Sequence, residues 1–357
     1  MWNHYFALCF LIAVQCCITS IGSSNVRSEI LSQMMEGYDN TMQPTIDVDE
    51  PTVIGMQLSI NRINSVDEIQ MDITLDLVLE RNWEDHRLKF DGSRINRTYM
   101  DMDPRHAGFI WIPDLFIRNE KSAEWHSVTI PNRMLRLYEN GSVMFISRIT
   151  VTAACPMDLF MFPFDTQKCP LILQSYAFTD EEMQYEWTEE QLDDRRHVKL
   201  SHFDITDVKF TKCATNLRGN EYFNEGRRPC LQAEFVLQRD VGYYVLEVYI
   251  PSMVLVSMSW IAFWISKNSP PARVTIGLTS VLTMATMMAS LNSHLPKSSM
   301  LKAIDVWLNG CLTFVFSAFL EYAMVSVQIA STEKRKIDKI ETEESECRHS
   351  YEEHQVS

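Results

Sequence analysis

The stretch Cys155-Pro-Met-Asp-Leu-Phe-Met-Phe-Pro-Phe-Asp-Thr-Gln-Lys-Cys169 is the most informative segment of this chain. Its two cysteines enclose thirteen residues that combine bulky aromatic side chains, two prolines and several charges. Two more cysteines, Cys213 and Cys230, follow before a strongly apolar region. An even number of cysteines is typical of disulfides in an exported segment. Pairing neighbours along the chain predicts the disulfides Cys155–Cys169 and Cys213–Cys230.

The N-terminus supports export. Residues 5–22 form an apolar run that ends in small residues, which predicts a signal peptide over residues 1–22; the alternative is a further membrane span. Two Asn-x-Ser/Thr triplets, at Asn96 and Asn140, are candidate glycosylation sites in an oxidising lumen. The net charge of -15 argues against a nucleic-acid partner.

The chain outside the apolar region has the pattern of a β protein. Residues 72–79 alternate polar and apolar side chains, as a half-buried strand does. Glu139-Asn140-Gly141-Ser142 between two apolar runs predicts a hairpin. Many short strands with such turns favour an extracellular β-sandwich over residues 51–240. Residues 23–50 are polar and are expected to be a mobile N-terminal lead with at most one short helix.

Residues 243–330 predict an α-helical transmembrane bundle. Three apolar segments, 244–265, 274–291 and 303–328, are each long enough to cross about 30 Å of hydrocarbon. Positive charge follows the first and third segments, which puts those ends in the cytoplasm. The charged residues 331–357 are then a cytoplasmic tail, expected to be disordered apart from a helical continuation of the third span.

The second span carries a polar stripe. Hydroxyl or small side chains recur on one helical face, interrupted by a single leucine. Such a stripe avoids lipid, so it faces either protein, with hydroxyls bonded back to helix carbonyls, or a water-filled pore. A ring of leucines would form a hydrophobic constriction that closes by dewetting. The stripe consists of Thr275, Thr279, Leu282, Thr286, Ala289 and Ser293.

The segment before this span is suited to anions. Pro271 fits the first turn of a helix, and helix N-termini carry partial positive charge. Arg273 adds a full positive charge, and neither it nor Ala272 is an acid that would attract a cation. Converging copies of this segment are therefore expected to favour chloride over sodium.

The cysteine-bounded stretch resembles the loop that names the Cys-loop receptors, the pentameric ligand-gated channels. Further motifs match in the family's order over roughly residues 50–330, and the anion-selective glycine-, GABA- and glutamate-gated branch is the most similar. The second cysteine pair resembles the extra disulfide of the glycine and glutamate branch. The matching motifs are Trp111-Ile-Pro-Asp114, Ser175-Tyr-Ala-Phe-Thr179, Gly242-Tyr-Tyr244, Ile250-Pro-Ser252 and Pro271-Ala-Arg273.

The resemblance implies a homo- or heteropentamer that binds a small-molecule neurotransmitter between subunits, in the plasma membrane and typically at synapses. One face of the site would use aromatic residues able to hold a cation, namely Phe116, Tyr176, Phe178, Tyr222 and Phe223. The other face would use the strand ending in Trp83 and the strand around residues 145–147. No cofactor, metal or enzymatic activity is implied.

One departure from the family bears on the ligand. Receptors for amino-acid transmitters usually place an arginine three residues before the tryptophan equivalent to Trp83, where it pairs with the ligand carboxylate. Here that position is Glu80, and a second arginine further upstream is replaced by Asn61. Arg81 is adjacent, but alternation along a strand sends it to the other face. An amine ligand is expected, with glutamate, glycine or GABA as the alternative.

The resemblance also implies residues that couple ligand binding to the pore. Arg239 is expected to pair with Glu68 or Asp67. The other coupling positions are Phe162, Pro163, Asp165 and Lys297.

The family has four spans, and this sequence shows three. The competing hypothesis is therefore a truncated, non-conducting subunit that regulates the assembly of sibling subunits. A cation-selective channel is a further alternative, disfavoured by Ala272.

Overall fold

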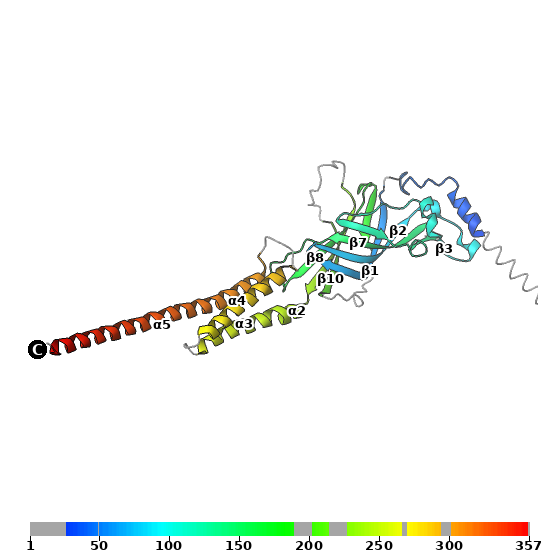
Figure 1. Cartoon of the computed structure of the whole chain (residues 1–357). Helices are drawn as coiled ribbons and strands as arrows, with labels where there is room; N and C mark the ends of the chain where they lie inside the picture. The colour runs from blue at the N-terminus through cyan, green and yellow to red at the C-terminus, as the bar shows by residue number, and fades with distance from the viewer. Residues whose placement is uncertain are drawn as a thin grey trace, which may run out of the picture. The chain divides into compact units, whose positions relative to one another are not determined.

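The computed structural model describes residues 26–355 except 49, 189–201, 214–226, 266–269 and 294–300, without the side chains beyond residue 344. The chain divides into two compact units (Figure 1). The first comprises Met1–Met157 and Thr166–Gln238, and the second comprises Asp158–Asp165 and Arg239–Ser357.

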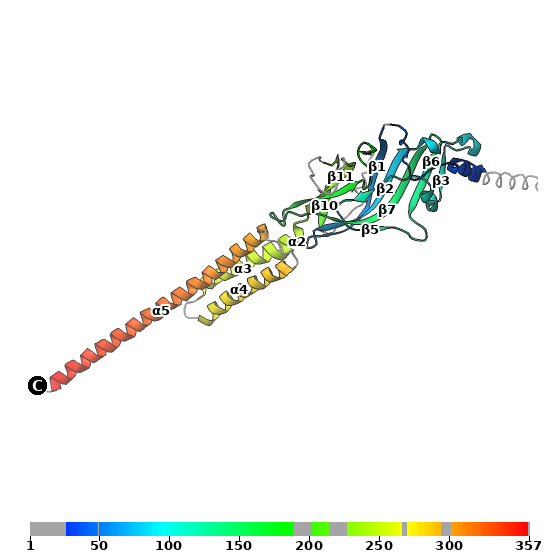
Figure 2. The same ribbon diagram turned by 90° about the horizontal axis from the view of Figure 1, so that it is seen from above.

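The first unit is a β-sandwich, as the strand pattern predicts. Its larger sheet has the order β3-β6-β7-β2-β1-β9, with β5 also paired to β7, and Figure 2 shows β1, β2 and β7 side by side. The smaller sheet has the order β10-β11-β8-β4. The strands of the larger sheet are β1 (Thr52–Asp67), β2 (Asp72–Glu84), β3 (Tyr99–Met102), β5 (Glu120–Trp125), β6 (Arg133–Tyr138), β7 (Ser142–Ala154) and β9 (Met183–Trp187); those of the smaller sheet are β4 (Phe116–Ile117), β8 (Thr166–Gln174), β10 (Phe203–Lys212) and β11 (Cys230–Arg239).

Strict alternation of side chains builds the core of the sandwich. Along β7 every second residue is buried, from Val143 to Ala153, and the residues between them are half-exposed. The same alternation runs along β8 and β11. Since successive side chains of a strand point to opposite faces, one face of each sheet packs inward and the other is left for partners or water.

The predicted hairpin joins β6 to β7, with Leu137 opposite Val143. Gly141 has a φ of 88°. A Cβ there would lie 2.6 Å from the carbonyl oxygen of Asp85. Both the positive φ and this close approach therefore require glycine at position 141. The Asn140 side chain accepts a hydrogen bond from the Ser142 amide at 3.0 Å, which is a standard use of asparagine in turns.

The N-terminal lead is attached to the sandwich, contrary to the expectation that it is mobile. Residues 26–35 form a helix whose Ile30 and Met34 are buried. Further along, Asn40 donates a side-chain hydrogen bond of 2.8 Å to the Gly108 carbonyl. Alternation and turn signals do not predict that this segment packs on the sandwich. Its few apolar residues are buried only once the rest of the unit has folded. Three short helical turns also belong to this unit: η1 (His86–Leu88), η2 (Gly92–Ile95) and η3 (Pro104–Phe109).

The second unit contains three helices long and apolar enough to cross a membrane among the residues described, over Gly242–Trp264, Pro271–Ser293 and Ala303–Glu344. Each begins within three residues of the start predicted from the sequence. The first consists of α2 (Gly242–Tyr244), η5 (Val245–Tyr249), α3 (Ile250–Ile261) and η6 (Ala262–Trp264), and the others are α4 (Pro270–Ser293) and α5 (Ala303–Gln355).

Two features of these helices depart from simple expectation. The turn Val245–Tyr249 is a π-helix, and Pro251 follows it. Because proline has no N–H and its ring displaces the carbonyl four residues earlier, a wider turn before it is favourable. The helix α5 continues to Gln355, so the helical continuation of the third span takes in nearly all of the tail predicted to be largely disordered.

Candidate transmitter site and pore-lining helix

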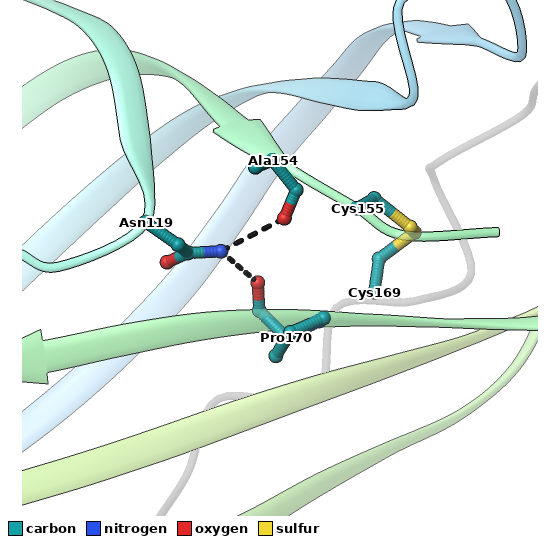
Figure 3. Close-up of a disulfide and its surroundings, with 5 residues drawn as sticks. All are labelled: Asn119, Ala154, Cys155, Cys169 and Pro170. Atoms are coloured by element: carbon teal, nitrogen blue, oxygen red, sulfur yellow. Dashed lines mark hydrogen bonds between the residues drawn. A yellow bond between two sulfur atoms is a disulfide. The ribbon is translucent and has the colours of Figure 1, made fainter. Parts of the chain in front are cut away.

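The disulfide Cys155–Cys169 closes the loop of thirteen residues between the two cysteines, and both cysteines are fully buried. Figure 3 shows the Asn119 amide beside it, where Nδ2 donates to the Ala154 carbonyl at 3.0 Å and to the Pro170 carbonyl at 2.8 Å. The Asn119 side chain thereby joins two strands that have no backbone pairing at this point. The second bond joins Cys213 to Cys230.

Two of the predicted aromatic residues, Phe116 and Tyr176, are in contact at the β4–β8 edge of the smaller sheet. Phe116 in β4 makes a T-shaped contact with Tyr176, with ring centroids 5.6 Å apart. Tyr176 is 63% exposed, so its ring is available to a ligand. Phe178 packs instead against the buried Trp111 at 6.1 Å, which makes it partly a core residue. Tyr222 and Phe223 lie outside the described residues.

Asp114 fixes the conformation of the segment that bears Tyr176. Its carboxylate accepts hydrogen bonds from the Ser175 hydroxyl at 2.8 Å and from the amides of Tyr176 and Ala177 at 2.7 and 2.8 Å. The Asp114 carbonyl in turn accepts from the Tyr185 hydroxyl. Burial, with the nearby Asp114 carboxylate, raises the pKa of Tyr185 well above its ordinary value, so the hydroxyl stays protonated as a donor.

The strand β2 divides the other predicted site residues between two faces. Glu80 is half-exposed on the outer face of the sheet, where its carboxylate accepts a hydrogen bond of 2.8 Å from Asn82. Trp83 is only 3% exposed and packs edge-on against Trp111 inside the sandwich. The prediction that Trp83 lines the site is therefore wrong. Glu80 and Trp83 are three positions apart, an odd number, so the strand points them in opposite directions.

The inner face also contains Arg81. Its guanidinium donates to the Pro113 carbonyl at 2.8 Å and lies 4.8 Å from the Phe145 ring centroid. Burial lowers the pKa of Arg81 to about 10, which leaves it charged at neutral pH. Arg81 therefore faces away from Glu80, as the alternation predicts. Phe145 and Ser147 are buried as well, so of residues 145–147 it is Ile146 that faces outward.

A polar network that the sequence pattern did not predict joins β2 and β7, with one further contact from β1. Arg148 makes two hydrogen bonds to the Asp76 carboxylate, at 3.0 and 2.6 Å. The Asn61 amide contacts the same carboxylate at 3.4 Å. The Arg148 hydrogen bond keeps the pKa of Asp76 below its ordinary value. Asp76 and Arg148 are 72 residues apart and meet only because β2 pairs with β7.

In the second unit, the tip of the cysteine-bounded loop meets the first span. Arg239 forms a buried two-point ion pair with Asp165, at 2.8 and 3.1 Å, and its guanidinium lies 4.6 Å from the Phe162 ring centroid. Phe162 also contacts Tyr244 at 4.8 Å. Three predicted coupling residues are thus joined in one cluster. The pairing of Arg239 with Glu68 or Asp67 stays a prediction, and Lys297 lies outside the described residues.

The loop tip also caps the third span. The first amides of α5, those of Ala303 and Ile304, donate to the carbonyls of Phe160 and Phe162 at 2.9 and 3.2 Å. The initial N–H groups of a helix have no partner within the helix, so these loop carbonyls satisfy them. Pro163, which follows Phe162 through a cis peptide bond, is part of the same turn.

The polar stripe of α4 is exposed along its length, and the opposite face is packed. All six stripe residues, including Leu282 at 61%, are exposed in the single chain. The packed face contains Gly277, Ser280 and Met284. The threonine hydroxyls bond back to helix carbonyls, for example Thr279 Oγ1 to the Thr275 carbonyl at 2.7 Å. These bonds satisfy the donors and leave the hydroxyl oxygens free to accept from water or to contact ions.

Arg273 does not lie on the stripe. Its guanidinium donates to the Ile265 carbonyl at the end of the first span, at 3.0 Å from Nε, and lies 5.9 Å from the Tyr322 ring centroid. The role of Arg273 in selecting anions stays a prediction. Thr275 is two residues away, about 200° around the helix, so the two cannot share a face. Pro271 and Ala272, by contrast, are exposed.

The candidate glycosylation sites Asn96 and Asn140 are both exposed, in turns of the first unit.

The chain matches two family models. Residues 27–241 match the neurotransmitter-gated ion-channel ligand binding domain, and residues 248–353 match the neurotransmitter-gated ion-channel transmembrane region. Together the matches cover most of the chain and follow the division into sandwich and helices. The chain belongs to the neurotransmitter-gated ion channels, the Cys-loop receptors, and is a ligand-gated channel subunit with an extracellular ligand-binding domain. Membership of this family implies pentameric assembly and binding of a small-molecule transmitter, and the family is not one of enzymes.

Proposed function

We propose that this chain is a subunit of a chloride channel opened by a cationic amine. The observation that carries the choice of ligand is Glu80 on the outer face of β2, at the position where amino-acid receptors of this family usually have arginine. A carboxylate there attracts an ammonium group and repels a ligand carboxylate. The Asn82 amide, at 2.8 Å, holds Glu80 without neutralising it.

The aromatic pair Phe116 and Tyr176 supports the same ligand class. Aromatic faces attract ammonium groups by about 0.5–2 kcal/mol, depending on desolvation. Tyr176 is exposed and its backbone is held by Asp114, so the ring is pre-organised for a ligand. In a pentamer, this edge of one subunit and the Glu80 face of the next would enclose the amine between them.

Two features support anion selectivity. Residues 266–273, which lead into α4 and form its first turn, contain Lys267 and Arg273 and no acid. Arg273 contributes its charge near this mouth even though its guanidinium is bound to the Ile265 carbonyl, because Coulomb interactions extend beyond contact distance. The exposed hydroxyl stripe of α4 would line the pore, and Leu282 would form the constriction.

Voltage clamp of cells that express the full chain tests both parts of the proposal. Serotonin, dopamine, tyramine, histamine and acetylcholine are compared with glutamate, glycine and GABA. We expect currents with one or more amines, and a positive shift of reversal potential when external chloride is replaced by gluconate. Currents with the amino acids alone would overturn the ligand assignment. A reversal potential that follows sodium would overturn the selectivity assignment.

The Glu80→Gln variant tests the carrying observation directly. Removing the charge while keeping the shape should raise the half-maximal concentration of the effective amine about tenfold, equivalent to about 1.4 kcal/mol. Glu84→Gln, at the exposed end of the same strand, is the matched control and should change it less than twofold. Equal shifts in the two variants would point to a general surface-charge effect and contradict a direct role for Glu80.

A further inference from the structure

The N-terminal lead contacts the segment that organises the transmitter site. The Tyr38 hydroxyl accepts a hydrogen bond of 3.0 Å from the Trp111 amide and donates one of 2.7 Å to the Asp85 carboxylate. Trp111 is 4% exposed and Asp85 is fully buried. A buried amide without a partner is costly, so the Tyr38 hydroxyl specifies where residue 111 can lie.

Arg87 holds Tyr38 in this position. Its guanidinium lies 4.4 Å from the Tyr38 ring centroid and donates to the hydroxyl at 3.1 Å. It also forms an ion pair with Asp85 at 2.8 Å, and it donates to the lead's Asp39 and Met42 carbonyls. Burial and the Asp85 carboxylate raise the pKa of Tyr38 well above its ordinary value, so the hydroxyl remains a donor over the physiological range.

The segment that Tyr38 holds continues to the exposed aromatic residue. The Trp111 ring packs on Phe178, and Asp114, three residues further on, accepts hydrogen bonds from the amides of Tyr176 and Ala177. Three side chains from outside the segment thus fix residues 111–114. The Tyr38 hydroxyl accepts from the Trp111 amide, the Arg81 guanidinium donates to the Pro113 carbonyl, and the Tyr185 hydroxyl donates to the Asp114 carbonyl. Only the first of these comes from outside the sheets.

We propose that Tyr38 is a positioning residue for the transmitter site, through which the N-terminal lead sets the placement of residues 175–178. The lead is therefore a second region from which transmitter affinity can be tuned, without contact between the lead and the transmitter. By reciprocity, any change that loosens residues 175–178 also loosens the lead. The proposal rests on the assignment of Tyr176 to the transmitter site, but its test requires no transmitter.

The test is hydrogen exchange of the purified full chain in lipid nanodiscs, with Tyr38→Phe against wild type. The variant keeps the ring and removes the hydroxyl. Losing this buried hydrogen bond should accelerate exchange of the Tyr176 and Ala177 amides about tenfold, with β7 amides unchanged. Arg94→Ala is the matched control. It removes the lead's contacts from Arg94 to Glu29 and Gln33, and it should leave residues 175–178 at the wild-type rate.

Two outcomes would overturn the proposal. One is faster exchange confined to the lead and residue 111. The other is equal acceleration in the sheet core, which would show general destabilisation. If Tyr38→Phe does not fold, Ser175→Ala gives the reciprocal measurement, and wild-type exchange over residues 36–42 in that variant would also overturn it. A channel that responds only to amino acids would contradict the proposed ligand while leaving these exchange results intact.

Discussion

The strand β2 and the helix α4 each present one packed face and one open face, but they separate them differently. In β2 the faces alternate residue by residue, so the open Glu80 and the packed Arg81 are neighbours in the chain. In α4 the open stripe and the packed face are broad, and one-residue shifts move a side chain by about 100°. A prediction of which face a strand residue occupies is therefore either right or wrong, and for Trp83 it was wrong. A prediction of which face a helical residue occupies tolerates small errors.

The largest effect should come from the packed face of β2. Trp83→Ala removes a buried indole that contacts Trp111, which should cost about 3–5 kcal/mol of the free energy of unfolding. The thermal midpoint of the purified chain, followed by size-exclusion chromatography after heating, should fall by about 10 °C. Asn82→Ala on the open face is the control and should change it little. A small effect of Trp83→Ala would restore the idea that this side chain is open to ligand.

The packed face of α4 should be the next most sensitive. A Cβ at Gly277 would lie 2.6 Å from Cδ2 of Phe319 in α5. Gly277→Val therefore overpacks the contact between the two helices, at a cost of about 1–3 kcal/mol. We expect less surface protein by biotin labelling. Leu278→Val, at the exposed neighbouring position, should label as wild type; equal losses would mean that the two faces do not differ.

The open face of α4 should respond in function and not in stability. Leu282→Thr replaces an apolar side chain with a shorter one that carries a hydroxyl, so the proposed constriction becomes wider and wettable. Voltage clamp should show current without transmitter, and surface labelling should be normal. Val281→Thr, off the stripe and half-buried, is the comparison. Transmitter-free current in that variant alone would assign the pore to another face.

The smallest effect concerns Asp76 on β2. Arg148 lowers the pKa of Asp76 in the folded state. Asp76 therefore stabilises the fold at pH values above the ordinary carboxyl pKa of about 3.9. That stabilisation is lost as the pH falls through the lower pKa of Asp76 in the folded state. The Arg148 side chain is 41% exposed, so solvent screening limits the contribution to about 0.5–1 kcal/mol. The thermal midpoint of Asp76→Asn should therefore be below that of wild type at pH 6 and approach it at pH 3. A constant difference would show that the pair does not titrate as described.

Local patterns predicted much of the molecule. The 139–142 hairpin and the strand at 72–79 follow from turn chemistry and alternation, which act over a few residues. The three membrane-spanning helices follow from the length of their apolar runs. The proximity of Phe116 and Tyr176 was predicted from the family motifs. Periodicity alone does not predict which residues far apart in the chain come close together. The Asp76–Arg148 pair and the Tyr38 contact carried no such signal, because each joins residues far apart in the chain.

The amino-acid sequence by itself determined the family, the disulfide pairing expected from neighbouring cysteines, the sandwich followed by apolar helices, and the presence of a carboxylate in place of an arginine at residue 80. Only the tertiary structure decided which side chains are accessible. It buried Trp83, turned Arg273 to the Ile265 carbonyl, joined Arg239 to Asp165 and attached the lead to Trp111. The physical reason is that exposure and pairing depend on which surfaces meet, and those surfaces are brought together by strand pairing and helix packing across many tens of residues.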